Sequence, residues 1–190
     1  STFPPSWFIR RLVTREIMNI RIATNQDSDD IKRVYLSAFP KGESEIVARI
    51  AIELLSENTT PQTISLIVAT DHSVVGHVAF SPVEIDNNED CQAYILAPLA
   101  MQADYQKRHI GSTLIKYGMQ QLSAMGVYIV FVYGDPNYYE RFGFNADAAR
   151  NYITPYKLQY PSGWQAIVLN EYAMEKVPVT INCVASLCDP

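Results

Sequence analysis

Within residues 96–112 an apolar run ends, a short polar turn follows, and Gly111 and Ser112 open an amphipathic helical pattern. This succession predicts a strand, a tight loop and the N-terminus of a helix. The first N–H groups of a helix have no partner inside it, and the helix dipole is positive there, so a helix start of this kind binds anions. Lys107 and Arg108 add two cations beside those amides, which indicates a phosphate or pyrophosphate as the guest. An ordinary strand–helix turn with two solvated cations is the competing interpretation.

The remaining pattern alternates strands and helices around this unit. Asp27 to Asp30 supply capping chemistry for a helix that carries apolar residues at helical spacing. A hairpin is expected around the turn at Asp71-His72-Ser73. The expected helices cover residues 27–39, 43–55 and 111–124. A first strand is expected to begin at residue 19, and further strands are expected at residues 64–69, 74–83, 93–101, 127–133 and 166–169. This order predicts an α/β (α+β mixed) domain whose mixed sheet has helices on both faces.

Composition limits the class of protein. A chain of 190 residues with 48% hydrophobic residues can bury the core of one domain, and its mean hydropathy of −0.05 excludes a disordered or membrane-spanning chain. A net charge of −5 argues against nucleic acid as the main partner and fits a cationic amine. Cys91, Cys183 and Cys188 lack metal-ligand spacing, so no metal site is expected, and free thiols in a reducing cytoplasm are the simplest interpretation.

The chain divides into three segments by pattern. Residues 1–17 form a leader of uncertain origin that lacks the apolar core of a secretory signal, and Met18 is a plausible native start. Residues 18–175 carry the expected catalytic domain. Residues 176–190 show no clear periodicity and are interpreted as a C-terminal tail.

A second motif follows the predicted strand at 127–133. Gly134-Asp135-Pro136-Asn137 ends that strand, and Tyr138 begins a short helix that stops at Gly143. The loop Gln106-Lys107-Arg108-His109-Ile110-Gly111 and the later run Tyr139-Glu140-Arg141-Phe142-Gly143-Phe144 together resemble the GNAT superfamily of acetyl-CoA-dependent N-acetyltransferases, in its YhbS-like branch. The resemblance covers roughly residues 18–173. It implies a GNAT-like fold, with a central mixed, mostly antiparallel sheet of about seven strands.

The resemblance also implies where acetyl-CoA would bind. Backbone groups near the end of the strand at 93–101 would hold the pantetheine arm and polarise the carbonyl. His109 stands where the family has its first loop glycine; we expect a right-handed helical conformation there, with an imidazole that either crowds the cofactor or adds a phosphate contact. The implied cofactor-binding residues are Leu99, Met101, Gln106, Lys107, Arg108, His109, Ile110, Gly111, Ser112 and Asn137.

In the family the amine attacks the thioester directly, and three roles follow. The signature implies that Tyr139 donates a proton to the departing thiolate, with Tyr138 as the adjacent alternative. Glu84 is the favoured candidate for the base, although Asp86, Glu43 and Glu45 are also possible. Acidic residues in a first helical turn usually oppose the dipole, so capping is the favoured interpretation of Glu43 and Glu45. Phe39, Glu43 and Glu45 are expected to contact the acceptor, whereas His77 is expected to be a packed core or groove histidine and His72 a solvated one.

The sequence therefore predicts a cytoplasmic acyltransferase that moves an acetyl group from acetyl-CoA to an amine of a small molecule or peptide. The expected enzyme is a monomer or homodimer without nucleic-acid or membrane partners. A module of the same fold that binds CoA or a metabolite as a sensor, with weak catalysis, is the alternative.

Overall fold

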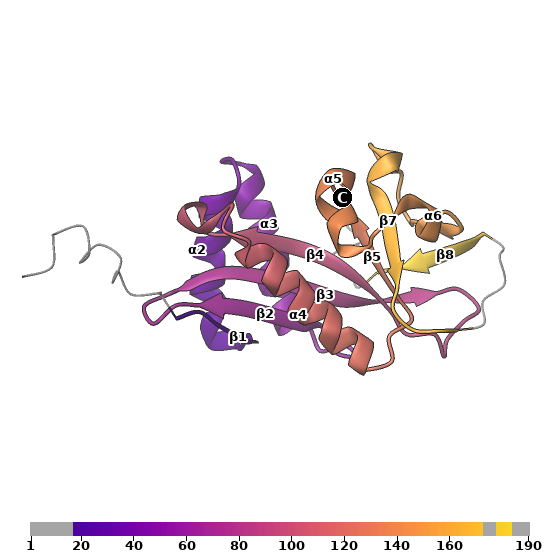
Figure 1. Ribbon diagram of the computed structural model, residues 1–190, viewed down its shortest axis with the longest axis horizontal. Coiled ribbons are helices and arrows are strands. Elements are labelled where there is room, and N and C mark those ends of the chain that lie inside the picture. The colour runs from indigo at the N-terminus through magenta and orange to yellow at the C-terminus, as the bar shows by residue number, and fades with distance from the viewer. Residues whose placement is uncertain (1–16, 173–177, 184–190) are drawn as a thin grey trace, which may run out of the picture.

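The computed structural model describes residues 17–172 and 178–183. In this part of the chain a sheet runs in the order β1-β2-β3-β4-β5-β7, and β8 pairs with the far end of β3 and with β6 (Figure 1). All pairs are antiparallel except β4 with β5 and β6 with β8. The strands are β1 Asn19–Ile22, β2 Ile64–Ala69, β3 Val74–Ile85, β4 Ala93–Met101, β5 Ile129–Tyr133, β6 Tyr152–Ile153, β7 Trp164–Val168 and β8 Val179–Asn182.

Helices cover both faces of the sheet. In Figure 1, α4 crosses one face, and α2 with α3 lies against the other. The helices are η2 Asn25–Asp27, α2 Ser28–Ala38, α3 Glu43–Ser56, η3 Ala103–Tyr105, α4 Ile110–Ala124, α5 Pro136–Tyr139, η4 Glu140–Phe142, α6 Ala146–Ala149 and η5 Pro161–Gly163. The predicted fold class is confirmed, with eight described strands where about seven were expected.

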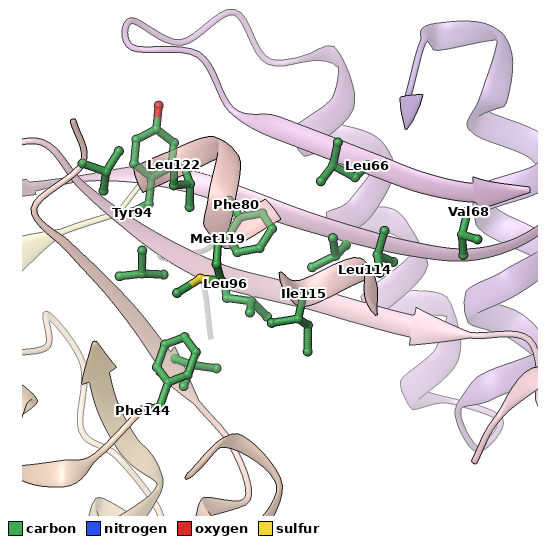
Figure 2. Packing of buried hydrophobic residues seen from close by; sticks show 14 of the residues in the cluster. Leu66, Val68, Phe80, Tyr94, Leu96, Leu114, Ile115, Met119, Leu122 and Phe144 are labelled. Carbon is green, nitrogen blue, oxygen red and sulfur yellow. The ribbon is translucent and has the colours of Figure 1, made fainter. Parts of the chain in front are cut away.

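The core under α4 follows from its apolar spacing. Leu114, Ile115, Met119 and Leu122 are buried and point at the sheet, as Figure 2 shows. Gly118 lies on the same side of the helix, and a Cβ there would come within 2.2 Å of the Phe80 ring. Glycine at this position therefore lets α4 approach β3 closely.

Side chains along β3 alternate between the two faces of the sheet, so some of them point away from α4. Phe80 packs under α4, whereas His77 contacts Tyr35 of α2 on the other side. Farther along the same face, the Phe131 ring stacks on Trp164 with ring centroids 5.0 Å apart. Two further buried clusters thus fill the second face, one under α2 and α3 and one near α6 and β8.

The expected strands and long helices are present, and their boundaries differ by a few residues. The segment interpreted as a tail contains β8, with Ile181 fully buried. Its β-branched residues Val179, Thr180 and Ile181 suit a strand, but the run is only four residues long, and pairing with β3 and β6 completes it. The proposed leader lies outside the described residues except for Ile17, as does most of residues 176–190.

β4 and β5 are paired over only part of their length. β4 and β5 pair only from Ala93 opposite Ile129 to Leu96 opposite Val132, and β4 continues to Met101 without this neighbour. The loop into α4 follows the end of β4, and α5 follows the end of β5. The two helix starts therefore flank the place where the strands part.

Among the described residues, no helix is both long and apolar enough to cross a membrane. Within the same residues no group of three or more His, Cys, Asp or Glu side chains is placed to hold a metal ion.

Candidate functional site

A pocket of about 510 Å³ lies at the parting of β4 and β5. Four parts of the chain form its walls: the end of α2, the end of β4, the loop and first turn of α4, and the α5–η4 segment. The lining residues are Ala38, Phe39, Leu99, Ala100, Met101, Tyr105, Gln106, Lys107, His109, Ile110, Gly111, Ser112, Tyr138 and Arg141.

The loop before α4 is built on two left-handed residues. Lys107 has φ 60° and His109 has φ 61°, and His109 is the N-cap of α4. The expectation of a right-handed helical His109 is therefore wrong. The position demands the backbone conformation that a glycine would supply, and histidine adopts it at a cost of about 1–2 kcal/mol. The turn directs the first N–H groups of a 15-residue helix towards the pocket.

Two side-chain contacts hold this loop in place. The Gln106 Nε2 donates to the Met101 carbonyl oxygen at 3.1 Å, which ties the loop to the end of β4. The Arg108 guanidinium lies over the Tyr105 ring, 5.2 Å from its centroid. Lys107 lines the pocket and Arg108 does not, so one of the two predicted cations faces the space that the helix start addresses.

Tyr138 forms the wall opposite the helix start. A Cβ built on Gly111 would lie 3.4 Å from the Tyr138 hydroxyl, so the phenol reaches across to the first turn of α4. Burial raises the pKa of Tyr138, and the nearby Arg141 charge and a hydrogen bond with the Ser112 side chain oppose that rise. The Arg141 guanidinium carbon lies 4.8 Å from the Tyr138 ring centroid. Tyr138 and Arg141 thus act as one stacked unit on the pocket wall.

Tyr139 sits differently from its neighbour. Its ring covers Gly134, where a Cβ would come within 2.5 Å of it, and packs edge-on against Phe144 at 5.8 Å. Burial raises its pKa, and so does Tyr138, so the phenol keeps its proton at neutral pH. Burial raises the pKa of Tyr35, and Tyr139 adds to that rise. The structure brings Tyr138 to the pocket lining and holds Tyr139 just behind it.

The α2 wall rests on a buried hydrogen-bonded chain. Phe39 stacks on Tyr35, with centroids 6.1 Å apart and ring planes 12° apart. The Tyr35 hydroxyl lies 2.7 Å from His77 Nδ1, and the Ser65 hydroxyl lies 2.6 Å from Nε2. Burial lowers the pKa of His77 to about 3, so the imidazole is neutral. The interpretation of His77 as a packed core histidine is confirmed.

The predicted carboxylates lie away from this pocket. Glu84 is near the far end of β3, six residues along the strand from Val78, which pairs with the lining residue Leu99. At about 3.3 Å per residue this is roughly 20 Å, too far for a base acting in the pocket. Glu84 instead lines a separate acidic pocket with Asp86 and Glu89. The sequence analysis placed Glu84 correctly near the end of a strand. The loop at residues 106–111, however, lies beside the beginning of β3, at the opposite edge of the sheet from Glu84.

The other predicted residues divide clearly. Glu43 and Glu45 are exposed in the first turn of α3 and do not line the pocket, whereas Phe39 does. Asn137 lies outside the lining, and its N–H is capped by the Asp135 carboxylate at 3.0 Å. Arg141 is a pocket residue that sequence reasoning missed. Its spacing of three from Tyr138 predicts a shared helix side and could have found it.

Comparisons with known proteins agree on one family. The model of the GNAT acetyltransferase domain matches residues 19–146. The Escherichia coli N-acetyltransferase YjhQ is 34% identical over 140 residues, which cover 72% of this chain and 75% of YjhQ. The N-acetyltransferase YhbS of the same organism is 33% identical over 132 residues, covering 69% of this chain and 75% of YhbS.

Solved structures extend the likeness over most of the chain. The E. coli YhbS structure in complex with CoA has a TM-score of 0.78 at 26% identity, covering 91% of this chain and 93% of YhbS. A GNAT acetyltransferase of Brucella melitensis in complex with acetyl-CoA has a TM-score of 0.68 at 29% identity, covering 87% of this chain and 96% of its own.

Proposed function

The chain belongs to the GNAT family of acetyltransferases, and we propose that it moves the acetyl group of acetyl-CoA directly onto an amine of a small molecule or peptide. The observation that carries this proposal is the left-handed loop at Lys107 and His109, which aims the start of α4 into the pocket where β4 and β5 part. The chain is an acyltransferase, and acetyl-CoA is its cosubstrate.

The residues present fit acetyl-CoA. The N–H groups of Ile110, Gly111 and Ser112 lack partners within the helix and suit the oxygens of a pyrophosphate. Lys107 adds a positive charge at the same end of the pocket. Leu99 and Met101 lie at the end of β4 that pairs with β3 but no longer with β5, so they are placed to accept the pantetheine arm along that edge. His109 keeps the loop conformation of a glycine, which supports a working loop rather than a degraded one.

Acetyl-CoA supplies an acetyl group activated as a thioester. The amine nitrogen forms the new C–N bond, the C–S bond breaks, and the electron pair leaves with the sulfur. We assign to Tyr139 the proton that the sulfur takes up, because Tyr139 opens the run Tyr139-Glu140-Arg141-Phe142-Gly143-Phe144 that resembles the family signature, and burial keeps its phenol protonated. Tyr138 is the alternative, supported by its place on the lining near Gly111 and Ser112. The surplus proton of the amine passes to water.

Tyrosine-to-phenylalanine variants separate these assignments, since they delete one oxygen and keep the ring. Tyr139→Phe should lower kcat by roughly 100-fold or more, with acetyl-CoA binding unchanged by calorimetry. Tyr138→Phe is the matched control and should act mainly on acetyl-CoA affinity. If Tyr138→Phe loses kcat and Tyr139→Phe does not, the role passes to Tyr138.

The function itself is tested by mixing the protein with acetyl-CoA and a panel of amines and following free-thiol release and product mass. Amine-dependent release is the expected result. Tight acetyl-CoA binding without transfer to any amine would instead favour a CoA-binding sensor, and absence of binding would refute both functions.

We also propose the setting of this reaction. Residues 18–175 would form the catalytic domain of a monomer or homodimer in the cytoplasm. The free, buried thiol of Cys91 is consistent with a reducing compartment.

A further inference from the structure

The pocket has a charged end and an uncharged end. Its charged side chains, Lys107 and Arg141, come from the loop before α4 and from η4. At the α2 side the lining consists of Ala38, Phe39 and Ala100, all apolar. The phosphates of acetyl-CoA would occupy the charged end near the start of α4. The acceptor would therefore meet the apolar end.

No carboxylate compensates a positive charge at that end. Among the described residues that line the pocket, none is Asp or Glu. Glu43 and Glu45 are exposed outside the lining, and Glu84 lies roughly 20 Å along β3 from the partner of Leu99. An ammonium group would therefore lose its hydration without gaining an ion pair, which is strongly unfavourable. It would also find no carboxylate to take the proton that it must lose before attack.

The apolar end is also flat and firmly held. Phe39 presents an aromatic ring that stacks on Tyr35 nearly in parallel. Tyr35 is fully buried, and its hydroxyl is fixed by His77, which Ser65 fixes in turn. A ring held in one orientation by a buried hydrogen-bonded chain provides a preorganised surface for a planar group.

We propose that the acceptor is an aromatic amine whose nitrogen, attached directly to the ring, is uncharged at neutral pH, and that Phe39 is the residue that selects it. This inference rests on the proposed acetyl transfer. The aryl nitrogen forms the C–N bond and releases its proton to water, and the thiolate leaves with the electron pair of the broken C–S bond. An uncharged nitrogen needs no base before attack, which matches a lining without carboxylates.

Aniline and cyclohexylamine form a matched pair of probes, because both carry one amine on a six-membered ring and only cyclohexylamine is charged at pH 7. With saturating acetyl-CoA, kcat/KM for aniline should exceed that for cyclohexylamine by roughly tenfold or more. Equal values, a preference for cyclohexylamine, or no acetylation of aniline would overturn the inference.

Phe39→Leu tests the wall, since it keeps an apolar side chain and removes the flat ring. KM for aniline should rise roughly threefold to tenfold, with acetyl-CoA affinity unchanged, and Phe39→Tyr should retain the low KM. Leu36→Ala, on the exposed side of α2 at 42% exposure, is the matched control and should leave KM unchanged. An unchanged KM in folded Phe39→Leu would remove Phe39 from this role.

The proposed function can fail separately. Acetyl-CoA binding by calorimetry and turnover of a lysine peptide or polyamine measure acetyl transfer without aniline. If those amines react and aniline does not, the acceptor class is wrong and the transferase stands. If acetyl-CoA does not bind, the proposed function fails first.

Discussion

His77 lies fully buried between two hydroxyls, with Tyr35 2.7 Å from Nδ1 and Ser65 2.6 Å from Nε2. His77→Gln is the informative change, because a glutamine amide offers both a donor and an acceptor but does not titrate. The change therefore removes the proton-binding site and leaves partners for both neighbours.

The magnitude follows from the pKa of the imidazole. Burial lowers it from 6.5 to about 3, so the unfolded chain binds a proton at mildly acid pH and the folded chain does not. The contribution of His77 to stability is complete above pH 6.5 and is lost as the pH falls towards 3, by up to about 1.4 kcal/mol per pH unit. Between pH 7 and pH 5 the loss amounts to about 2 kcal/mol.

Urea unfolding at pH 7 and pH 5 measures this loss in both proteins. The free energy of unfolding of the natural chain, relative to His77→Gln, should fall by about 2 kcal/mol over that interval. His72→Gln, a matched change at the exposed turn between β2 and β3, controls for the removal of an imidazole. A constant difference at the two pH values would refute the reasoning. Independently, His77 ring signals in NMR spectra should not titrate between pH 7 and pH 5.

Three further changes probe the loop and the first helix. Gly111→Val places a branched side chain between the Tyr138 hydroxyl and the helix start, so calorimetry should find acetyl-CoA binding lost, and retained affinity in a protein with unchanged Tm would contradict the loop assignment. His109→Gly relieves the left-handed strain at the cost of chain entropy, so urea unfolding should show a gain of about 0.5–1 kcal/mol; a loss would mean that the imidazole makes stabilising contacts. The Arg21 hydrogen bond lowers the pKa of Asp27 from 3.8 to about 2, so the stability that this pair adds is present above pH 3.8 and is lost as the pH falls through 2. Asp27→Asn should therefore cost about 1–2 kcal/mol at pH 7 and only a small part of that at pH 2, and an equal cost at both would exclude the ion pair as its source.

Much of the fold could be predicted from local pattern. The apolar residues of α4 recur at helical spacing, and β2 and β3 alternate around a clear turn, so the elements were found within a few residues of their observed ends. β8 was missed because it is only four residues long: Val179, Thr180 and Ile181 favour a strand, but so short a run is fixed by its pairing with β3 and β6.

The site could be predicted where one loop forms it and not where distant segments meet. Residues 106–112 follow each other along the chain, so their chemistry is visible in order, although the left-handed His109 was not. Phe39 was expected at the acceptor and lines the pocket, whereas Tyr35 and Arg141 reach the wall or the lining only through packing of α2 and η4. Glu84 was misplaced for the same reason, since adjacency to a strand end does not say which end of the sheet holds the site.

The most direct measurement is a crystal structure of the protein grown with acetyl-CoA. The account predicts pyrophosphate oxygens within hydrogen-bond distance of the N–H groups of Ile110, Gly111 and Ser112, and the thioester sulfur beside the hydroxyl of Tyr139 or Tyr138. A pyrophosphate bound away from the start of α4, or a thioester outside the opening between β4 and β5, would contradict it.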